Sequence, residues 1–127
     1  MAKTYDQLPV YIAVYELLLK TMEMTKHVPR EFRFTLCEDI NKGLIRVLTL
    51  VRKANRKESE SQRLGYLTEA MDQISDVEVE LRVLHDMKSV STNLYAQTAF
   101  DLVEAEKQIE KWQGYIQGKQ EKSNSTN

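Results

Sequence analysis

The sequence has a single cysteine, few prolines and glycines, and no long hydrophobic run. The lone cysteine, Cys37, excludes an internal disulfide bond, which fits a protein of the reducing cytoplasm. The four glycines are scattered, so they form no glycine-rich loop of the kind that binds phosphate. No apolar segment follows a basic start, and the apolar stretches are too short to cross a bilayer. We therefore expect neither a signal peptide nor a membrane-spanning helix.

The groups needed for catalysis or metal binding are equally sparse. The two histidines, His27 and His85, fall at the ends of different expected helices, and no Glu-x-x-His spacing is present. No nucleophile, base and orienting group come together in the pattern. Cys37 is expected to be a small buried core residue rather than a reactive thiol. The sequence thus predicts a protein that is not an enzyme and holds no metal or cofactor.

The composition fits one domain with an uneven distribution of charge. A chain of 127 residues, of which 42% are hydrophobic, is large enough to bury a core. Its formal net charge of −1 conceals a basic segment followed by an acidic one from Glu58 to Glu80. A local basic patch can still attract a polyanion. Tyr11, Tyr15 and Trp112 are expected to lie in the core or at an interface rather than to form a platform on which bases stack.

Apolar spacing predicts an all-α chain of four helices and no strands. The first runs from Pro9 to about His27, capped by Asp6, and the second from about Pro29 to Arg56. The third follows a capping box of Ser59 and Gln62 and ends near Lys88, and the fourth follows Ser91 or Thr92. Short connections imply an antiparallel up-down four-helix bundle over residues 9–118, after a lead of residues 1–8 and before a disordered polar tail of residues 119–127.

The first expected helix carries more apolar residues than one buried face needs. A second buried face is typical of a central helix or of an oligomer contact. The apolar positions are Tyr11, Val14, Tyr15, Leu18 and Met22 with Thr25, broadened by Ile12, Leu17 and Leu19.

The segment from Leu36 to Lys57 combines an apolar face with a cationic one. Its apolar residues recur at helical spacing, and no Asp or Glu occurs between Ile40 and Lys57. Charge alone favours the simpler interpretation, in which the basic face is only exposed to solvent. The more specific interpretation is that this face binds an anionic partner. Acidic positions on the next helix, Glu69, Asp72, Asp76, Glu78 and Glu80, could neutralise part of this face.

Five short stretches stand out by their order and spacing: Tyr5–Tyr11, Tyr15–Leu19, Thr25–Phe32, Leu50–Asn55 and Gln108–Gln113. Together they resemble the Avd family, the accessory variability determinants of diversity-generating retroelements. That family is similar in turn to four-helix-bundle proteins encoded in intervening sequences of bacterial ribosomal RNA genes. The resemblance covers about residues 4–116, although a pI near 6.1 makes this chain less basic than the nucleic-acid-binding members.

The resemblance implies a homopentameric barrel that binds nucleic acid and partners a reverse transcriptase in mutagenic retrohoming, without supplying chemistry itself. Binding to template RNA or cDNA would be electrostatic and independent of sequence. The alternative is a structural oligomer or adaptor that meets other proteins through the extra apolar faces of the first and third expected helices, the latter marked by Val79 and Val83. The residues that match the basic surface of the family are Arg30, Arg33, Lys42, Arg46, Arg52, Lys53, Arg56 and Lys57.

Overall fold

The computed structural model describes residues 4–56 and 58–125, with side chains described up to Lys119. All of its regular elements are helical, and the described residues contain no strand. In chain order the elements are η1 (Tyr5–Gln7), α1 (Pro9–Thr25), α2 (Arg30–Phe32), η2 (Arg33–Cys37), α3 (Glu38–Ala54), α4 (Glu60–Asp86) and α5 (Thr92–Ser125).

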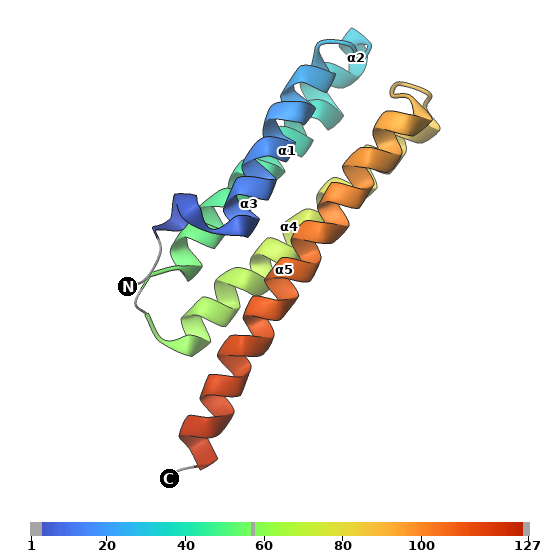
Figure 1. Cartoon of the computed structure of the whole chain (residues 1–127). Helices are drawn as coiled ribbons and strands as arrows, with labels where there is room; N and C mark the ends of the chain where they lie inside the picture. Colours follow the sequence, from blue (N-terminus) through green and yellow to red (C-terminus); the bar gives the residue numbers. More distant parts are fainter. Residues whose placement is uncertain (1–3, 57, 126–127) are drawn as a thin grey trace.

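The long helices α1, α3, α4 and α5 form an antiparallel four-helix bundle (Figure 1). Each packs against its neighbours in the order α1, α3, α4, α5, and α5 closes the ring against α1. The chain reverses direction at every connection, so both termini lie at the same end of the bundle (Figure 1). The expected fold class is therefore confirmed at the level of one chain.

The core consists of aliphatic side chains from all four long helices. Its largest fully buried members include Leu17, Leu44, Ile74, Leu102 and Ile109. Apolar residues at helical spacing from Leu64 to Leu84 and from Leu94 to Ile116 predict one buried face on each of the last two helices, and these side chains are buried or half-buried. The broad apolar face expected on α1 is only partly buried, because the side chains at its edge are exposed to solvent. These are Ile12, Tyr15, Leu19 and Met22.

Two of the expected helix starts are confirmed by their capping hydrogen bonds. The Ser59 hydroxyl accepts from the Gln62 amide at 3.2 Å, and the Gln62 side chain accepts from the Ser59 amide at 3.3 Å. At the start of α5, the Ser91 hydroxyl accepts from the Leu94 amide at 3.1 Å.

The expected cap of the first helix is wrong. Asp6 lies inside η1, where its carboxylate accepts from the Thr4 hydroxyl at 2.6 Å, and Leu8 precedes the first helical residue, Pro9. A short helical turn, η1, therefore precedes α1, where the sequence predicted only a capping residue.

The second expected helix is interrupted by the π-helical turn η2. Such a turn inserts one residue into an α-helix and rotates the residues on its two sides relative to each other. Here it lets Phe32 and Leu36 pack against the core while Cys37 and Ile40 are fully buried. Burial raises the pKa of the Cys37 thiol, which agrees with its expected place in the core.

The polar segment that begins at residue 119 was expected to be disordered, but it is helical up to Ser125. Helix α5 continues to Ser125 and extends past the other helices (Figure 1). Lysine, glutamine and glutamate are good helix formers, and no glycine or proline follows Gly118 to end the helix. Residues 126 and 127 of the expected tail lie outside the described residues.

Candidate nucleic-acid interface

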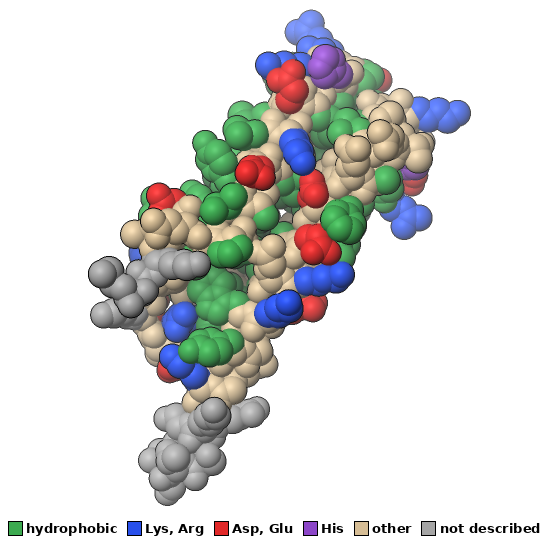
Figure 2. Space-filling model, in the orientation of Figure 1, with side chains coloured by type: hydrophobic (Ala, Val, Ile, Leu, Met, Phe, Trp, Pro, Cys, Tyr) green, Lys and Arg blue, Asp and Glu red, His purple; other side chains and the backbone are tan. Residues whose placement is uncertain are grey.

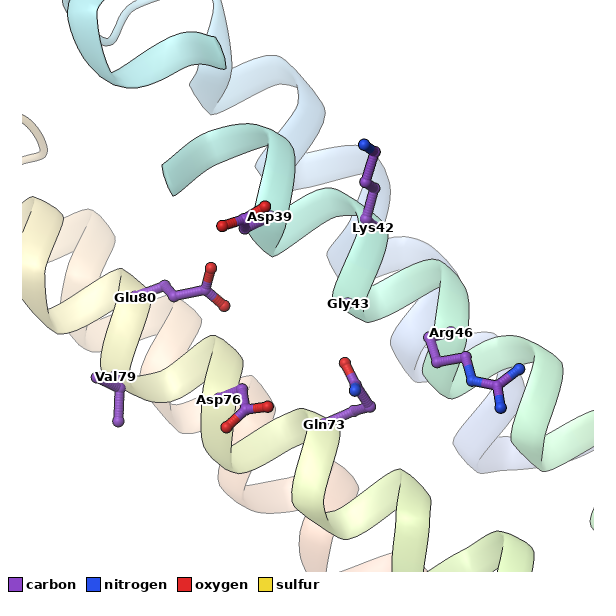
Figure 3. Close-up of a pocket in the computed structure, with 8 residues that line it drawn as sticks. All are labelled: Asp39, Lys42, Gly43, Arg46, Gln73, Asp76, Val79 and Glu80. Carbon is purple, nitrogen blue, oxygen red and sulfur yellow. The ribbon is translucent and has the colours of Figure 1, made fainter. Parts of the chain in front are cut away.

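A close approach of α3 and α4 shapes the surface on which two of the expected cations, Lys42 and Arg46, lie. Gly43 is buried, and a Cβ atom built on it would lie 2.8 Å from Val77 Cγ2. Beside this contact runs an open groove of about 640 Å³ (Figure 3). Its lining residues are Asp39, Lys42, Gly43 and Arg46 of α3 and Gln73, Asp76, Val79 and Glu80 of α4.

Both cations of this groove are paired with carboxylates. Lys42 Nζ lies 2.8 Å from Glu38 Oε1 one turn earlier on α3, and this hydrogen bond raises the pKa of Lys42. Arg46 Nη2 lies 3.1 Å from Glu69 Oε1 of α4. The expected neutralisation of the basic face by the following helix therefore takes place at Arg46.

The other half of the groove is acidic. In Figure 3 the carboxylates of Asp39 and Glu80 point toward each other across it, with Asp76 nearby. Burial, together with the charges of Asp39 and Asp76 and a hydrogen bond with Asp39, raises the pKa of Glu80 from 4.5 to about 7. This half would repel a phosphate backbone, so the groove is a poor site for a polyanion.

The cations at the C-terminal end of α3 have a different environment. Among the described residues, neither Arg52 nor Lys53 has a carboxylate oxygen within 4.0 Å. Lys53 Nζ instead lies 5.8 Å from the centre of the Tyr66 ring, and Arg56 forms only a long pair of 4.0 Å with Glu58. The positive charge of this segment is therefore largely available to a partner.

Further basic and aromatic side chains gather at the same end of the bundle. Arg63 Nε donates to the Ala54 carbonyl at 2.8 Å, and the Arg63 guanidinium lies 6.0 Å from the centre of the Trp112 ring. Lys119 Nζ lies 5.2 Å from the centre of the Tyr115 ring. We call this surface the basic–aromatic end: Arg52, Lys53, Arg56, Arg63, Tyr66, Trp112, Tyr115 and Lys119.

The sequence predicted only the α3 part of the basic–aromatic end. Arg63 and Trp112 come from α4 and α5, and they meet because these helices run antiparallel with α4 starting where α5 approaches its end (Figure 1). In the sequence, basic and aromatic residues occur close together in the segments that form the start of α4 and the last part of α5. This pattern does not reveal that the two segments are in contact.

Arg30 and Arg33, two further expected site residues, do not join this surface. Arg33 donates from Nε to the Val28 carbonyl at 2.8 Å and from Nη2 to the Lys26 carbonyl at 3.0 Å, so it fixes the end of α1. Arg30 is exposed and lies close to Arg33 in the sequence. Both precede α3, whose 17 residues span about 25 Å at 1.5 Å per residue, and Arg52 lies near the far end of that helix. Lys57 lies outside the described residues.

The face formed by α1 and α5 shows no continuous basic area. Figure 2 shows Lys and Arg side chains interleaved with Asp and Glu on it. Lys20 of α1 lies 3.3 Å from Asp101 of α5, which is one such pairing. The basic–aromatic end is therefore a better candidate for binding a polyanion than this face or the α3–α4 groove.

The described residues provide no group of three His, Cys, Asp or Glu side chains that could hold a metal ion. Of the two histidines, His85 stacks on Tyr95 with ring centres 4.4 Å apart and has Nε2 3.3 Å from the Thr92 hydroxyl. His27 lies 3.9 Å from Glu23 on the same helix.

A comparison with known protein families found no family that matches this chain, and a search of curated proteins found no match either. The Avd resemblance therefore stays a prediction. None of the helices, over the residues described, is long and apolar enough to span a membrane.

Proposed function

We propose that this chain is a non-enzymatic accessory protein that binds nucleic acid at the basic–aromatic end. The observation that carries the proposal is that Arg52 and Lys53 have no carboxylate partner in the described part of the chain, unlike Lys42 and Arg46. Cations that are not already paired can replace the counterions of a phosphate backbone, which is the main source of sequence-independent affinity. The proposed site is thus smaller than the set of eight cations that the resemblance implies.

The Avd resemblance supports a more specific role for this binding. In that role the protein holds template RNA or cDNA of a diversity-generating retroelement close to its reverse transcriptase. A homo-oligomeric ring, such as the pentamer that the resemblance implies, would repeat the basic–aromatic end around its axis. Repetition raises the effective concentration of binding sites without adding a new contact to any one of them.

A second candidate is a structural oligomer or adaptor without a nucleic-acid role. It is favoured by the exposed apolar face of α1, on which Ile12, Tyr15, Leu19 and Met22 recur at helical spacing. A protein partner or another copy bound on this face would cover side chains that water now contacts. Light scattering of the purified protein tests whether copies associate.

The binding test compares two variants that lose the same charge at different places. The first is Arg52→Gln with Lys53→Gln and Arg56→Gln. The control is Lys20→Gln with Lys26→Gln and Arg82→Gln, three exposed cations that are each paired with a carboxylate elsewhere. Fluorescence anisotropy with a labelled structured RNA measures affinity, and circular dichroism checks that both variants fold.

We expect the first variant to lose affinity by about tenfold or more and the control by about threefold or less, because only the first removes available cations. Equal losses would assign binding to net charge rather than to the basic–aromatic end. Absence of binding by the unaltered protein would leave the structural candidate.

The reverse-transcriptase role has its own test. A reverse-transcriptase gene with a repeat pair beside the gene for this chain would provide the enzyme for co-purification after nuclease treatment. We expect a complex that survives nuclease, and its absence would separate nucleic-acid binding from the proposed partnership.

A further inference from the structure

Three tyrosines form a row on the surface next to the basic–aromatic end. The Tyr5 and Tyr11 rings meet edge to face with centres 5.2 Å apart, and the Tyr11 and Tyr15 rings are nearly parallel with centres 6.4 Å apart. Tyr5 is 39% exposed and Tyr15 is 48% exposed. Tyr11 is half-buried and packs against the core, which is one of the two roles expected for it, whereas Tyr5 and Tyr15 lie at the surface.

A shallow groove joins this row to α3. Tyr5 and Tyr11 form one side, and Ile45, Leu48, Thr49 and Arg52 of α3 form the other, around a volume of about 160 Å³. Pockets for drug-sized ligands are larger, about 300–1,000 Å³. The groove is therefore suited to a single small ring system rather than to an extended molecule buried whole.

The groove offers the chemical groups that a nucleotide uses. Its tyrosines present flat aromatic faces on which a base can stack, and Ile45 and Leu48 provide apolar contact. The Thr49 hydroxyl has no hydrogen-bond partner among the described residues and can meet a polar base edge. Arg52 can meet a phosphate. Burial raises the pKa of Tyr11, and the nearby charge of Arg52 opposes part of this shift.

We infer that the substrate class of the proposed function is single-stranded nucleic acid, with unpaired bases stacked along Tyr5, Tyr11 and Tyr15 and the adjoining phosphate on Arg52. This inference rests on the proposed function and specifies it. Bases in a duplex are stacked on each other and cannot reach the tyrosines, whereas the unpaired bases of a single strand can. The groove is continuous with the basic–aromatic end through Arg52, so the rest of the strand can follow Lys53 and Arg56.

The test compares an unstructured single strand with a duplex. The probes are a fluorescein-labelled 12-nucleotide oligouridine and a 12-base-pair RNA duplex, each titrated with the full chain. Tyr5→Leu with Tyr15→Leu removes two exposed rings, and Tyr15→Phe keeps a ring without its hydroxyl. Phe100→Leu is the matched control, since Phe100 is an exposed aromatic residue on α5 that does not line the groove.

We expect the double leucine variant to bind oligouridine about tenfold more weakly or worse and to bind the duplex within about twofold of the unaltered protein. Tyr15→Phe and Phe100→Leu should retain affinity for oligouridine. The double leucine variant should keep the salt dependence of binding, because stacking on a ring releases no counterions. Arg52→Gln should weaken the salt dependence, because it removes a cation that replaces a counterion of the phosphate backbone.

Three outcomes would contradict parts of this account in different ways. Undiminished oligouridine binding by the double leucine variant would overturn the inference and leave the proposed function in place. Failure of the unaltered protein to bind either probe would overturn the proposed function itself. Equal loss for both probes, together with a change from oligomer to monomer in light scattering, would show that the row is a contact between copies and overturn the stacking site.

Discussion

Gly43 of α3 lies so close to Val77 of α4 that a Cβ atom at Gly43 would be 2.8 Å from Val77 Cγ2. Both residues are buried, and Val77 belongs to the core. Glycine costs a helix about 1 kcal/mol relative to alanine, so its presence in α3 is explained by the close packing of the two helices.

Substitution of Gly43 by alanine is expected to destabilise the bundle by about 1–3 kcal/mol, since overpacking of a tight contact outweighs the gain in helix propensity. The measurement is chemical unfolding followed by circular dichroism. Gly65→Ala is the control, because nothing lies within 4 Å of a Cβ atom built there. Gly65→Ala should stabilise the protein by up to about 1 kcal/mol, and the same gain at Gly43 would contradict the close approach.

The carboxyl of Glu80 makes stability depend on pH. Its pKa in the folded protein is raised from 4.5 to about 7 by burial, Asp39 and Asp76, so the folded state holds this proton more tightly than the unfolded state. The stabilisation is complete below pH 4.5 and is lost as the pH rises through about 7. This contribution should therefore decrease between about pH 5 and pH 8.

Glu80→Gln removes this titration and should raise stability at pH 8 by about 1 kcal/mol, a value reduced because solvent screens a carboxyl that is only partly buried. At pH 5, where the unaltered carboxyl is mostly protonated, the variant and the unaltered protein should differ little. Unfolding curves of both proteins across this range give the measurement. A difference that is the same at both values of pH would contradict the assigned pKa.

Arg33 is expected to act on stability and not on nucleic-acid binding. Its guanidinium donates to the Val28 and Lys26 carbonyls at the end of α1. Arg33→Ala should cost about 1–2 kcal/mol of unfolding free energy, as expected for two hydrogen bonds from a charged donor that is partly solvated. Arg30→Ala, which removes an exposed neighbour, should change stability by less than about 0.5 kcal/mol. Equal effects would show that Arg33 does not fix this turn.

The fold was predictable because local signals agreed along most of the chain. Apolar residues at helical spacing predicted the buried faces of α3, α4 and α5, and the Ser59 capping box predicted the start of α4. The exposure of Tyr15 and Met22 was not predictable, since α1 carries more apolar residues than the single-chain core can cover. The π-helical turn was missed because no proline or glycine marks it.

The candidate site was less predictable than the fold. Periodicity places a cation on a helix face, but its partner depends on how the neighbouring helix is rotated and shifted. Glu69 meets Arg46 across α3 and α4, while no carboxylate meets Arg52 within the described chain. The contact between Arg63 and Trp112 likewise depends on the antiparallel alignment of α4 and α5.

The central claim is that cations at the end of α3, and not those paired in the α3–α4 groove, bind the phosphate backbone. The most direct test is the slope of the logarithm of RNA affinity against the logarithm of salt concentration. Each phosphate contact contributes about −0.7 to −0.9 to this slope. Relative to the unaltered protein, Arg52→Gln with Lys53→Gln and Arg56→Gln should make the slope shallower by about 2–3, whereas Lys42→Gln should leave it unchanged. Equal slopes for the unaltered protein and the triple variant would contradict the account.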